Sequence, residues 1–445
     1  MNLRRSVLLL LALFFILPAQ AQKIYTYVGR VGSDSFLLAW GTTAGNGNTI
    51  GRNSVPLGKA VVEVAGRRIP SDRNWVEVNN LSPDREYPYR LLLDGRLAGE
   101  GTVRTHPAKA TKLAFFVLGD YGTGKPPQYR IAEAMRQELE KRIRSDNPVR
   151  FVLTTGDNIY GDRLLGLFQT QTRDGSLDRH WGPKFFQPNE PLLKRIPFYP
   201  ALGNHDVGSV LGPYLDNFFF PVAEPARYYT FSFGGLADFF ALDTTGIEAG
   251  GAGDSLAPQG RQLEWLKNSL AASQSPWKIA YFHHPPFNAG PGHPASLDSL
   301  EHVVRLFAEA GVRAVFSGHE HNFQFSRQNG LTGGVLYVIS GAGGNLRSGN
   351  IQAKMGRANI AGTAAQHHFL RVEIEGRALR ITPLSWEPVR VRDPNGQTLP
   401  LPIVVELAEE RAALPGSLPP STGVRNRTQL WGIGPQPQSV LGTAP

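Results

Sequence analysis

The sequence predicts an α/β fold built as a two-sheet α/β/β/α sandwich, with a smaller all-β sandwich preceding it along the chain. From Leu113 onward, apolar stretches of strand length run directly into polar clusters, and amphipathic stretches of helix length follow several of them, as in α/β proteins. Residues 23–107 instead contain short alternating segments separated by turn residues, a pattern typical of a β-sandwich. The 445 residues exceed the usual ~150 residues of one domain, which leaves room for both parts.

The first residues have the pattern of a secretory signal. Arg4 and Arg5 precede an apolar run from Val7 to Leu17, and the small-residue sequence Ala19-Gln20-Ala21 follows, which is the order of a signal peptide and its cleavage site. The alternative is a membrane anchor, but the run is much shorter than the ~20 residues that cross a bilayer. We therefore expect cleavage after Ala21 and a secreted or periplasmic protein without a membrane span.

The composition restricts how the protein is stabilised and which metals it can bind. The chain has no cysteine, so disulfides and cysteine-ligated metal sites are excluded. The formal net charge is +9, but Lys and Arg are scattered apart from the run Lys141-Arg142-Ile143-Arg144, whereas nucleic-acid-binding proteins usually cluster them. We interpret the charge as a general attraction for anionic substrates and expect no nucleic-acid partner.

Residues 22–108 are predicted to form the smaller β-sandwich domain. Its alternating segments include Ser35–Trp40, Ala60–Val64 and Tyr87–Leu91. The piece Leu81–Tyr89 resembles the corner of fibronectin type III domains, in which a tyrosine hydroxyl ties a loop to the next strand. This resemblance implies a fibronectin type III-like module that acts as a spacer or lip beside the catalytic domain and carries no chemistry of its own.

The larger α/β domain is predicted to span residues 109–410. Its expected strands are Leu113–Leu118, Phe151–Thr154, Phe198–Leu202, Trp277–Phe282, Val312–Phe316, Gly334–Ile339, His368–Ile374 and Ala378–Pro383. Its expected helices are Pro127–Arg144, Pro258–Ser273 and Ser296–Gly311. The segment Gly161–Glu190 has little regular patterning and is interpreted as a pocket rim, and Gly341–Gly344 is interpreted as a turn. Residues 411–445 are rich in proline and are predicted to be an extended tail.

Five polar clusters each follow one of the first five predicted strands. They are Gly119-Asp120-Tyr121-Gly122, Gly156-Asp157-Asn158-Ile159-Tyr160, Gly203-Asn204-His205-Asp206, His283-His284-Pro285-Pro286 and Gly318-His319-Glu320-His321. Strands of open α/β sheets end along a common edge, where such sheets place their sites. Glycines permit the tight turns that bring side chains together. We therefore expect the Asp, Tyr, Asn and His side chains to converge.

Asp, Asn, His and Tyr without Cys form a ligand set suited to Fe, Mn or Zn. The candidate ligands are Asp120, Asp157, Tyr160, Asn204, His283, His319 and His321. They exceed the needs of one site, whereas two cations sharing a carboxylate would use them all and would clamp the attacking and leaving oxygens of a phosphoryl displacement. Asp157 is the natural bridge, because its cluster alone offers a carboxylate ligand together with a further ligand, Tyr160, one turn away.

The five clusters in this order resemble those of the calcineurin-like metallophosphoesterases, and Tyr160 narrows the resemblance to the purple acid phosphatases. The resemblance covers residues 113 to about 385. It implies a ferric ion held by Asp120, Tyr160 and His321. It also implies a divalent ion (Fe, Zn or Mn) held by Asn204, His283 and His319, with Asp157 bridging the two. The implied activity is hydrolysis of small phosphomonoesters.

The sequence offers two candidates for one metal ligand. His283 and His284 both stand before a proline, and the family's order of His, any residue and Pro favours His283 as the ligand, with His284 flanking the pocket.

Cations lower the pKa of bound water from ~15.7 toward ~7, so we expect hydroxide to attack phosphorus in line. An imidazolium can protonate the departing alkoxide. His205 is the first candidate for this role and His293 the second, with a solvated loop residue as the alternative for His293.

Three other functions compete with a phosphomonoesterase. In many phosphodiesterases and nucleotidases of the superfamily the first cluster reads Asp, any residue, His, but this chain has Gly122 at that position and offers Tyr160 instead. An exported alkaline phosphatase with a similar sandwich would need a cysteine at its iron site, and the chain has none. A binding protein that kept the fold and lost its metals is disfavoured by the presence of every candidate ligand.

Overall fold

The computed structural model describes residues 23–43, 50–165, 168–172, 175, 180–224, 226–248 and 256–407. The predicted signal peptide (residues 1–21) and the predicted tail (residues 411–445) lie outside the described residues. Within the described ranges, no helix combines the length and the apolar character needed to span a bilayer. These ranges belong to one compact unit that ends at Leu407.

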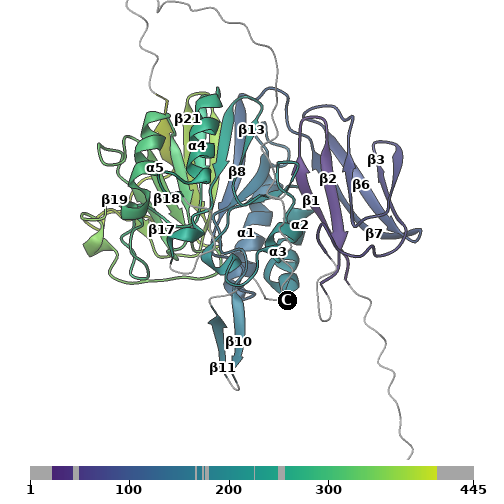
Figure 1. Cartoon of the computed structure of the whole chain (residues 1–445), viewed down its shortest axis with the longest axis horizontal. Coiled ribbons are helices and arrows are strands. Elements are labelled where there is room, and N and C mark those ends of the chain that lie inside the picture. The colour runs from purple at the N-terminus through teal and green to yellow at the C-terminus, as the bar shows by residue number, and fades with distance from the viewer. Residues whose placement is uncertain are drawn as a thin grey trace, which may run out of the picture. The chain divides into compact units, whose positions relative to one another are not determined.

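The amino-terminal part is a sandwich of two antiparallel sheets (Figure 1). Its strands are β1 (Tyr25–Val31), β2 (Phe36–Gly41), β3 (Ala60–Val64), β4 (Arg67–Ser71), β5 (Trp75–Val78), β6 (Glu86–Leu93) and β7 (Arg96–Arg104). One sheet has the order β1-β2-β5 and the other β4-β3-β6-β7. Inward-facing residues such as Trp40, Val62 and Leu91 form its core, because side chains alternate across a strand. The predicted boundary near residue 108 falls between β7 and the next strand.

A tyrosine ties the loop before β6 to the sandwich. Tyr87 Oη accepts a hydrogen bond of 2.7 Å from the backbone N–H of Ser82, and the ring of Tyr87 is buried in the sandwich core. This is the contact expected from the sequence of the loop. The likeness of the whole module to fibronectin type III domains stays a prediction.

The α/β part contains two mixed sheets that face each other. One has the order β12-β9-β8-β20-β21-β22 and the other β13-β14-β15-β16-β18-β17-β19. The strands of the first sheet are β8 (Lys112–Leu118), β9 (Val149–Thr154), β12 (Phe198–Pro200), β20 (Phe369–Glu375), β21 (Ala378–Leu384) and β22 (Ile403–Glu406). Those of the second are β13 (Tyr229–Phe233), β14 (Ala237–Ala241), β15 (Trp277–Tyr281), β16 (Ala314–Ser317), β17 (Phe323–Ser326), β18 (Leu336–Ser340) and β19 (Ile360–Ala364).

Aromatic side chains hold the two sheets together. Phe115 of β8 meets Phe239 of β14 and Phe316 of β16 edge to face, with ring centroids 5.4 and 6.3 Å apart. Edge-to-face pairs add about 0.5–1.5 kcal/mol each to the gain from burial. The same core continues to Tyr27 of β1, whose ring contacts Phe186 and Phe219.

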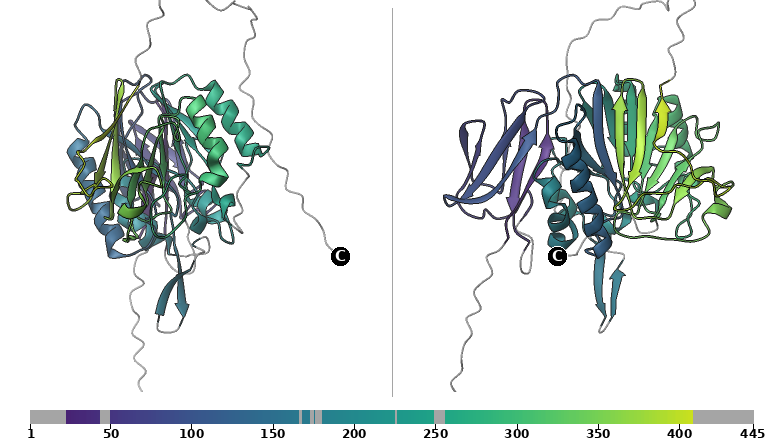
Figure 2. Two further views of the ribbon diagram at one scale, coloured as in Figure 1. Left: turned by 90° about the vertical axis from the view of Figure 1, so that its left-hand side faces the viewer. Right: turned by 180° about the vertical axis from the view of Figure 1, so that it is seen from behind.

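Helices cover the outer faces of both sheets, as the two groups of differently coloured helices in Figure 2 illustrate. The helices are α1 (Pro126–Arg142), α2 (Gln187–Leu193), α3 (Gly212–Asn217), α4 (Arg261–Ala272) and α5 (Leu297–Glu309). Leu263, Leu266 and Leu270 lie at helical spacing on one face of α4, and they pack with Phe307 of α5 against Ala280 of the second sheet. Ile131 of α1 packs into the core of the first sheet. The predicted α/β/β/α layering is therefore present.

The five cluster strands are divided between the two sheets, because β8, β9 and β12 belong to the first sheet and β15 and β16 to the second. One sequence-based expectation needs correction, since the segment Gly161–Glu190 has regular structure. It contains the hairpin of β10 (Gly161–Leu165) and β11 (Phe168–Thr172), followed by the helical stretch η1 (Gly182–Phe186) that leads into α2.

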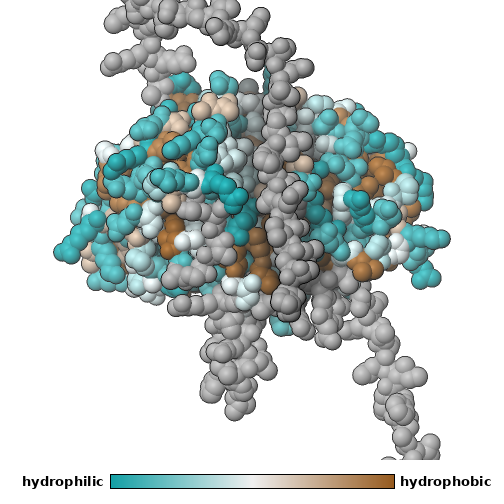
Figure 3. All heavy atoms as spheres, in the orientation of Figure 1, coloured by the Kyte–Doolittle hydropathy of each residue, from teal (hydrophilic) through white to brown (hydrophobic). Residues whose placement is uncertain are grey.

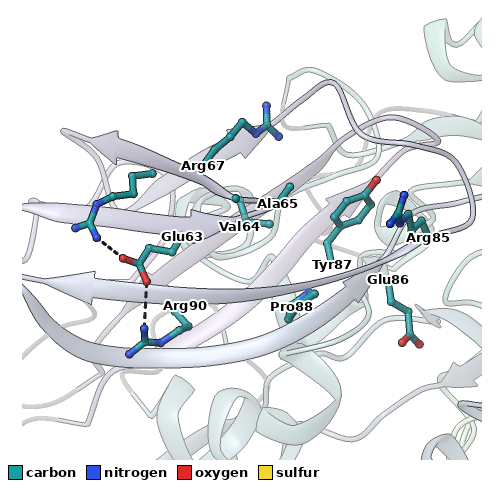
Figure 4. A pocket seen from close by; sticks show the side chains of 11 residues that line it. Glu63, Val64, Ala65, Arg67, Arg85, Glu86, Tyr87, Pro88 and Arg90 are labelled. Atoms are coloured by element: carbon teal, nitrogen blue, oxygen red, sulfur yellow. Dashed lines mark hydrogen bonds and ion pairs between the residues drawn. The ribbon is translucent and has the colours of Figure 1, made fainter.

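A cavity of about 810 Å³ lies on the sandwich, where β3, β4 and β6 line it (Figure 4). Its carboxylate Glu63 already forms ion pairs with Arg68 and Arg90, and no candidate ligand is among its lining residues. The face drawn in Figure 3 is mostly hydrophilic with scattered apolar residues. These surfaces therefore give no reason to place the chemistry outside the α/β part.

Replacing Tyr87 with Phe should lower the free energy of unfolding by about 1 kcal/mol, because the N–H of Ser82 loses its acceptor. Denaturant unfolding followed by tryptophan fluorescence measures this change. Tyr27→Phe is the matched control, since the buried hydroxyl of Tyr27 has no hydrogen-bond partner and its removal should cost nothing. Equal destabilisation by both variants would contradict a structural role for the Tyr87 hydrogen bond.

Candidate metal centre

The polar clusters begin with sharp turns of the backbone. Asp120, Asp157 and His319 have φ angles of 53°, 50° and 70°, in the left-handed region that costs a residue with a side chain roughly 1–2 kcal/mol. Gly156 has a φ of 94°, and a β-carbon there would come within 2.6 Å of His283 Nδ1. Such conformations persist only where surrounding contacts fix them, and they concentrate at functional sites.

The first group of donors consists of Asp120, Tyr160 and His321. Tyr160 Oη lies 3.2 Å from Asp120 Oδ1 and 3.2 Å from His321 Nε2. His321 Nε2 lies 3.3 Å from Asp120 Oδ1. All three side chains are buried. They therefore form a closed triangle of one nitrogen and two oxygen donors.

The second group is arranged around His283. Its Nε2 lies 2.9 Å from Asn204 Oδ1 and 3.2 Å from His319 Nδ1. The same nitrogen is 3.4 Å from Asp157 Oδ1. These contacts bring together residues that follow β9, β12, β15 and β16, and thus ends of strands from both sheets.

Asp157 belongs to both groups. Besides its approach to His283, its carboxylate lies with Asp120 and His321 in a set whose ligand atoms are all within 4.8 Å of one another. The backbone N–H of His205 donates to Asp157 Oδ1 at 3.0 Å, which orients the carboxylate. The carboxylate of Asp157 therefore lies close to donors of both groups.

The arrangement fits a pair of cations. Two donors that each bind one cation at ~2.1 Å and at right angles lie ~3.0 Å apart, and the separations within the first triangle are 3.2 to 3.3 Å. Buried carboxylates also require compensation by cations or hydrogen bonds, and Asp120 and Asp157 are both buried. The oxygen and imidazole donors suit Fe, Zn or Mn.

Burial and neighbouring charges shift the pKa values of the candidate ligands in different directions. Burial, together with the neighbouring carboxylate of Asp157, raises the pKa of Asp120 to about 8. Burial also acts to raise the pKa of Asp157, but the charges of His283 and His205 outweigh it and bring this pKa below its ordinary value. Burial and the charge of Arg347 lower the pKa of His321 to about 4. His321 is thus neutral above mild acid, which is the form that binds metals.

Further hydrogen bonds orient the donors. His283 Nδ1 pairs with the carbonyl of Thr155 at 2.9 Å, which directs Nε2 toward Asn204. Asp206 accepts hydrogen bonds from the backbone N–H groups of Asn158 at 3.0 Å and Gly203 at 2.8 Å, so it joins the loop after β9 to the loop after β12. Contacts of this kind fix the tautomer and orientation of metal ligands.

His284 lies next to His283 and His319, and its imidazole could join theirs around a cation. Its Nδ1 pairs with Thr244 Oγ1 at 2.9 Å, and its Nε2 lies 3.6 Å from Glu248 Oε1. His283, in contrast, contacts both Asn204 Oδ1 and Asp157 Oδ1. These contacts support His283 as the candidate ligand.

Both candidate proton donors lie beside the two groups. The ring of His205 is 4.4 Å from that of Tyr160, and its Nε2 is 3.8 Å from Asp157 Oδ2. The ring of His293 lies 3.7 Å from that of His319. Burial and the charge of Arg347 lower the pKa of His293 to about 4. This low pKa disfavours His293 as a proton donor.

Sequence reasoning missed three charged residues of the centre. Glu320 accepts hydrogen bonds from the backbone N–H groups of Gly292 at 3.1 Å and His293 at 2.9 Å. Glu248 Oε1 lies 3.5 Å from His319 Nε2, and the backbone N–H of Arg347 donates to the carbonyl of His321 at 2.8 Å. The position of Glu320 between two predicted ligands could have revealed it. Glu248 and Arg347 follow no pattern in the sequence.

Residues 113–323 match the family model of the calcineurin-like phosphoesterases, and this range contains all five polar clusters. The chain carries a calcineurin-like phosphoesterase domain. It is therefore a hydrolase that acts on phosphoric ester bonds. The matched range begins within β8 and ends at the start of β17.

Relatives of the phosphoesterase domain include acid phosphatases. Tartrate-resistant acid phosphatase type 5 of Rattus norvegicus is 28% identical over 261 residues, which cover 53% of this chain and 74% of that protein. Among solved structures, purple acid phosphatase PPD1 from yellow lupin (Lupinus luteus) seeds superposes with a TM-score of 0.61 at 16% identity, covering 86% of this chain and 74% of that chain. PhoD superposes with a TM-score of 0.58 at 16% identity, covering 85% of this chain and 92% of that chain. At these identities the structural matches establish the fold.

Without metal, the contribution of Asp120 to the stability of the folded chain should be lost as the pH rises from about 4 to about 8. The folded-state pKa of Asp120, about 8, lies above the ~3.9 of an unfolded Asp, so the folded state binds the proton more tightly and this stability is lost through the folded pKa. Asp120→Asn should therefore be more stable than wild type at pH 8 and similar at pH 5, as measured by urea unfolding in EDTA. The exposed Asp72→Asn serves as control, and an unchanged pH dependence in Asp120→Asn would refute this explanation.

Proposed function

We propose that the protein is a secreted acid phosphatase of the purple acid phosphatase type that hydrolyses small phosphomonoesters at a binuclear metal centre. The observation that carries the proposal is the position of Tyr160, whose phenol oxygen lies 3.2 Å from both Asp120 Oδ1 and His321 Nε2. A tyrosine ligand replaces the imidazole that Gly122 does not provide. This difference favours a phosphomonoesterase over the diesterases and nucleotidases of the superfamily.

The candidate ligands divide between two cations. Asp120, Tyr160 and His321 would hold a ferric ion. Asn204, His283 and His319 would hold a divalent ion (Fe, Zn or Mn), and Asp157 would contact both. When bound, these cations supply Lewis-acid polarisation of the phosphoryl oxygens and make a water-derived nucleophile available in mild acid.

The protein's own residues position the centre and move the proton. The N–H of His205 holds Asp157 Oδ1 at 3.0 Å, and the imidazole of His205 lies partly exposed beside Tyr160. From this position His205 would donate a proton to the departing alkoxide. His293, whose ring lies 3.7 Å from that of His319, would shield the second cation and is the weaker candidate for the proton donor.

The proposed domain organisation agrees with a secreted enzyme. Residues 1–21 would be the signal peptide, 22–108 a fibronectin type III-like module, 109–410 the catalytic domain and 411–445 a tail. The 3+4 strand order of the sandwich and the hydrogen bond from Ser82 N–H to the Tyr87 hydroxyl support the second assignment. The Arg4-Arg5 pair and the apolar run behind it support the first.

The purified protein should contain iron, hydrolyse an aryl phosphate and absorb visible light through a ferric tyrosinate. Tyr160→Phe should abolish the colour, whereas Tyr121→Phe should keep it, because Tyr121 is equally buried but bonds to Asn158. Metal analysis and absorption spectra measure these outcomes. A colourless wild type that contains iron would remove the ferric-tyrosinate assignment. A protein with neither metal nor turnover would instead be a binding protein.

His205→Gln should lower kcat about 10²-fold or more for alkyl phosphates, whose leaving group needs a proton, which is the scale of general-acid catalysis. Hydrolysis of nitrophenyl phosphate should fall much less, because nitrophenolate leaves without one. His293→Gln is the comparison variant and should not show this dependence on the leaving group. An equal loss for both substrates in His205→Gln would assign His205 a structural role.

A further inference from the structure

The loop that follows β18 is fixed by its backbone to two ligand loops. The N–H of Gly343 donates to the carbonyl of Gly119 at 3.0 Å, and that of Gly344 donates to the carbonyl of Asp120 at 3.0 Å. At the end of the loop, the N–H of Arg347 donates to the carbonyl of His321 at 2.8 Å. The segment interpreted from the sequence as a turn therefore places Arg347 directly beside the candidate metal centre.

The guanidinium of Arg347 is partly buried without a counter-charge. Its Nη1 is buried and has no hydrogen-bond acceptor, and no carboxylate forms an ion pair with Arg347 among the described residues. The buried Arg150, by contrast, pairs with Asp84 at 2.7 Å. Burying an ion without a partner is costly. An unpaired guanidinium at this position therefore indicates an anion that binds there.

Arg347 lies between the loops that carry His293 and His321. Its Cδ and Cζ pack so closely on Gly292 that a β-carbon there would come within 2.7 and 2.8 Å of them. Its backbone N–H is tied to the carbonyl of His321. The side chain of Arg347 therefore lies against the His293 loop while its backbone is held by the His321 loop.

Two carboxylates beside the candidate metal centre have other partners. Glu320 accepts hydrogen bonds from the N–H groups of Gly292 and His293, and Glu248 faces the imidazoles of His284 and His319. Neither forms an ion pair with Arg347 among the described residues. The substrate itself is then the natural source of the missing negative charge.

We propose that Arg347 binds the phosphoryl group of the substrate and gives the enzyme a preference for dianionic phosphomonoesters over phosphodiesters. This inference rests on the proposed function. A guanidinium is a planar fork that matches the geometry of phosphate oxygens. A phosphomonoester presents three terminal oxygens and two charges, whereas a diester presents two oxygens and one charge. An added guanidinium therefore contributes more to the binding of the monoester.

Arg347→Gln should weaken the binding of inorganic phosphate to the metal-loaded protein on the order of tenfold or more, the usual effect of losing a hydrogen bond to a charged group. Isothermal titration calorimetry measures this affinity. The KM for nitrophenyl phosphate should rise by a similar factor while that for bis(nitrophenyl) phosphate changes little. Arg347→Lys should restore only part of the loss. Arg390→Gln, at an exposed arginine, should behave like wild type, and metal content should be equal throughout.

The outcomes separate this inference from the proposed function. Unchanged phosphate affinity in Arg347→Gln, with wild-type turnover intact, would overturn the role of Arg347 and leave the phosphatase standing. A parallel rise of KM for monoester and diester would overturn the preference. A wild type that binds phosphate through Arg347 but hydrolyses no ester would contradict the proposed function and support the anion site.

Discussion

The structure depends on the burial of two carboxylates within one cluster of acceptor groups. Asp120 and Asp157 are both buried, and burial together with the charge of Asp157 disfavours ionisation of Asp120. Hydrogen bonds offset part of this cost. The backbone N–H of His319 donates to both oxygens of Asp120 at 3.1 and 3.0 Å. Protonation of Asp120 or a bound cation would offset the remainder.

The same contacts connect two sheets that would otherwise meet only through apolar packing. Asp120 and Asp157 follow strands of the first sheet, and His283 and His319 follow strands of the second. His283 Nδ1 pairs with the carbonyl of Thr155 across this boundary. The separation of the candidate ligands is therefore set by the packing of sheet on sheet. The aromatic side chains between the sheets, such as Phe115 and Phe239, thereby help to position the candidate ligands.

The candidate ligands can be named from the sequence, whereas the way their strands meet cannot. Each ligand cluster carries its own signal, because apolar strands lead directly into Asp, Asn or His with adjacent glycines. The distribution of the strands over two sheets depends on long-range pairing, such as β8 with β20, which no local pattern encodes. Arg347 illustrates the same limit. Its proposed role rests on the hydrogen bond from its backbone N–H to the carbonyl of His321 and on the lack of an acceptor for its buried Nη1. Both are properties of the folded chain.

Cation binding in this chain would also serve stability. With no cysteine, no disulfide can join distant segments, whereas the candidate ligands from Asp120 to His321 come from both sheets and nearly the whole phosphoesterase domain. Binding energy that exists only in the folded state adds to folding stability. Such binding removes the electrostatic cost of the buried carboxylates at the same time. The cluster that supplies the chemistry would then also be the link that holds the two sheets in register, and loss of metal would weaken both.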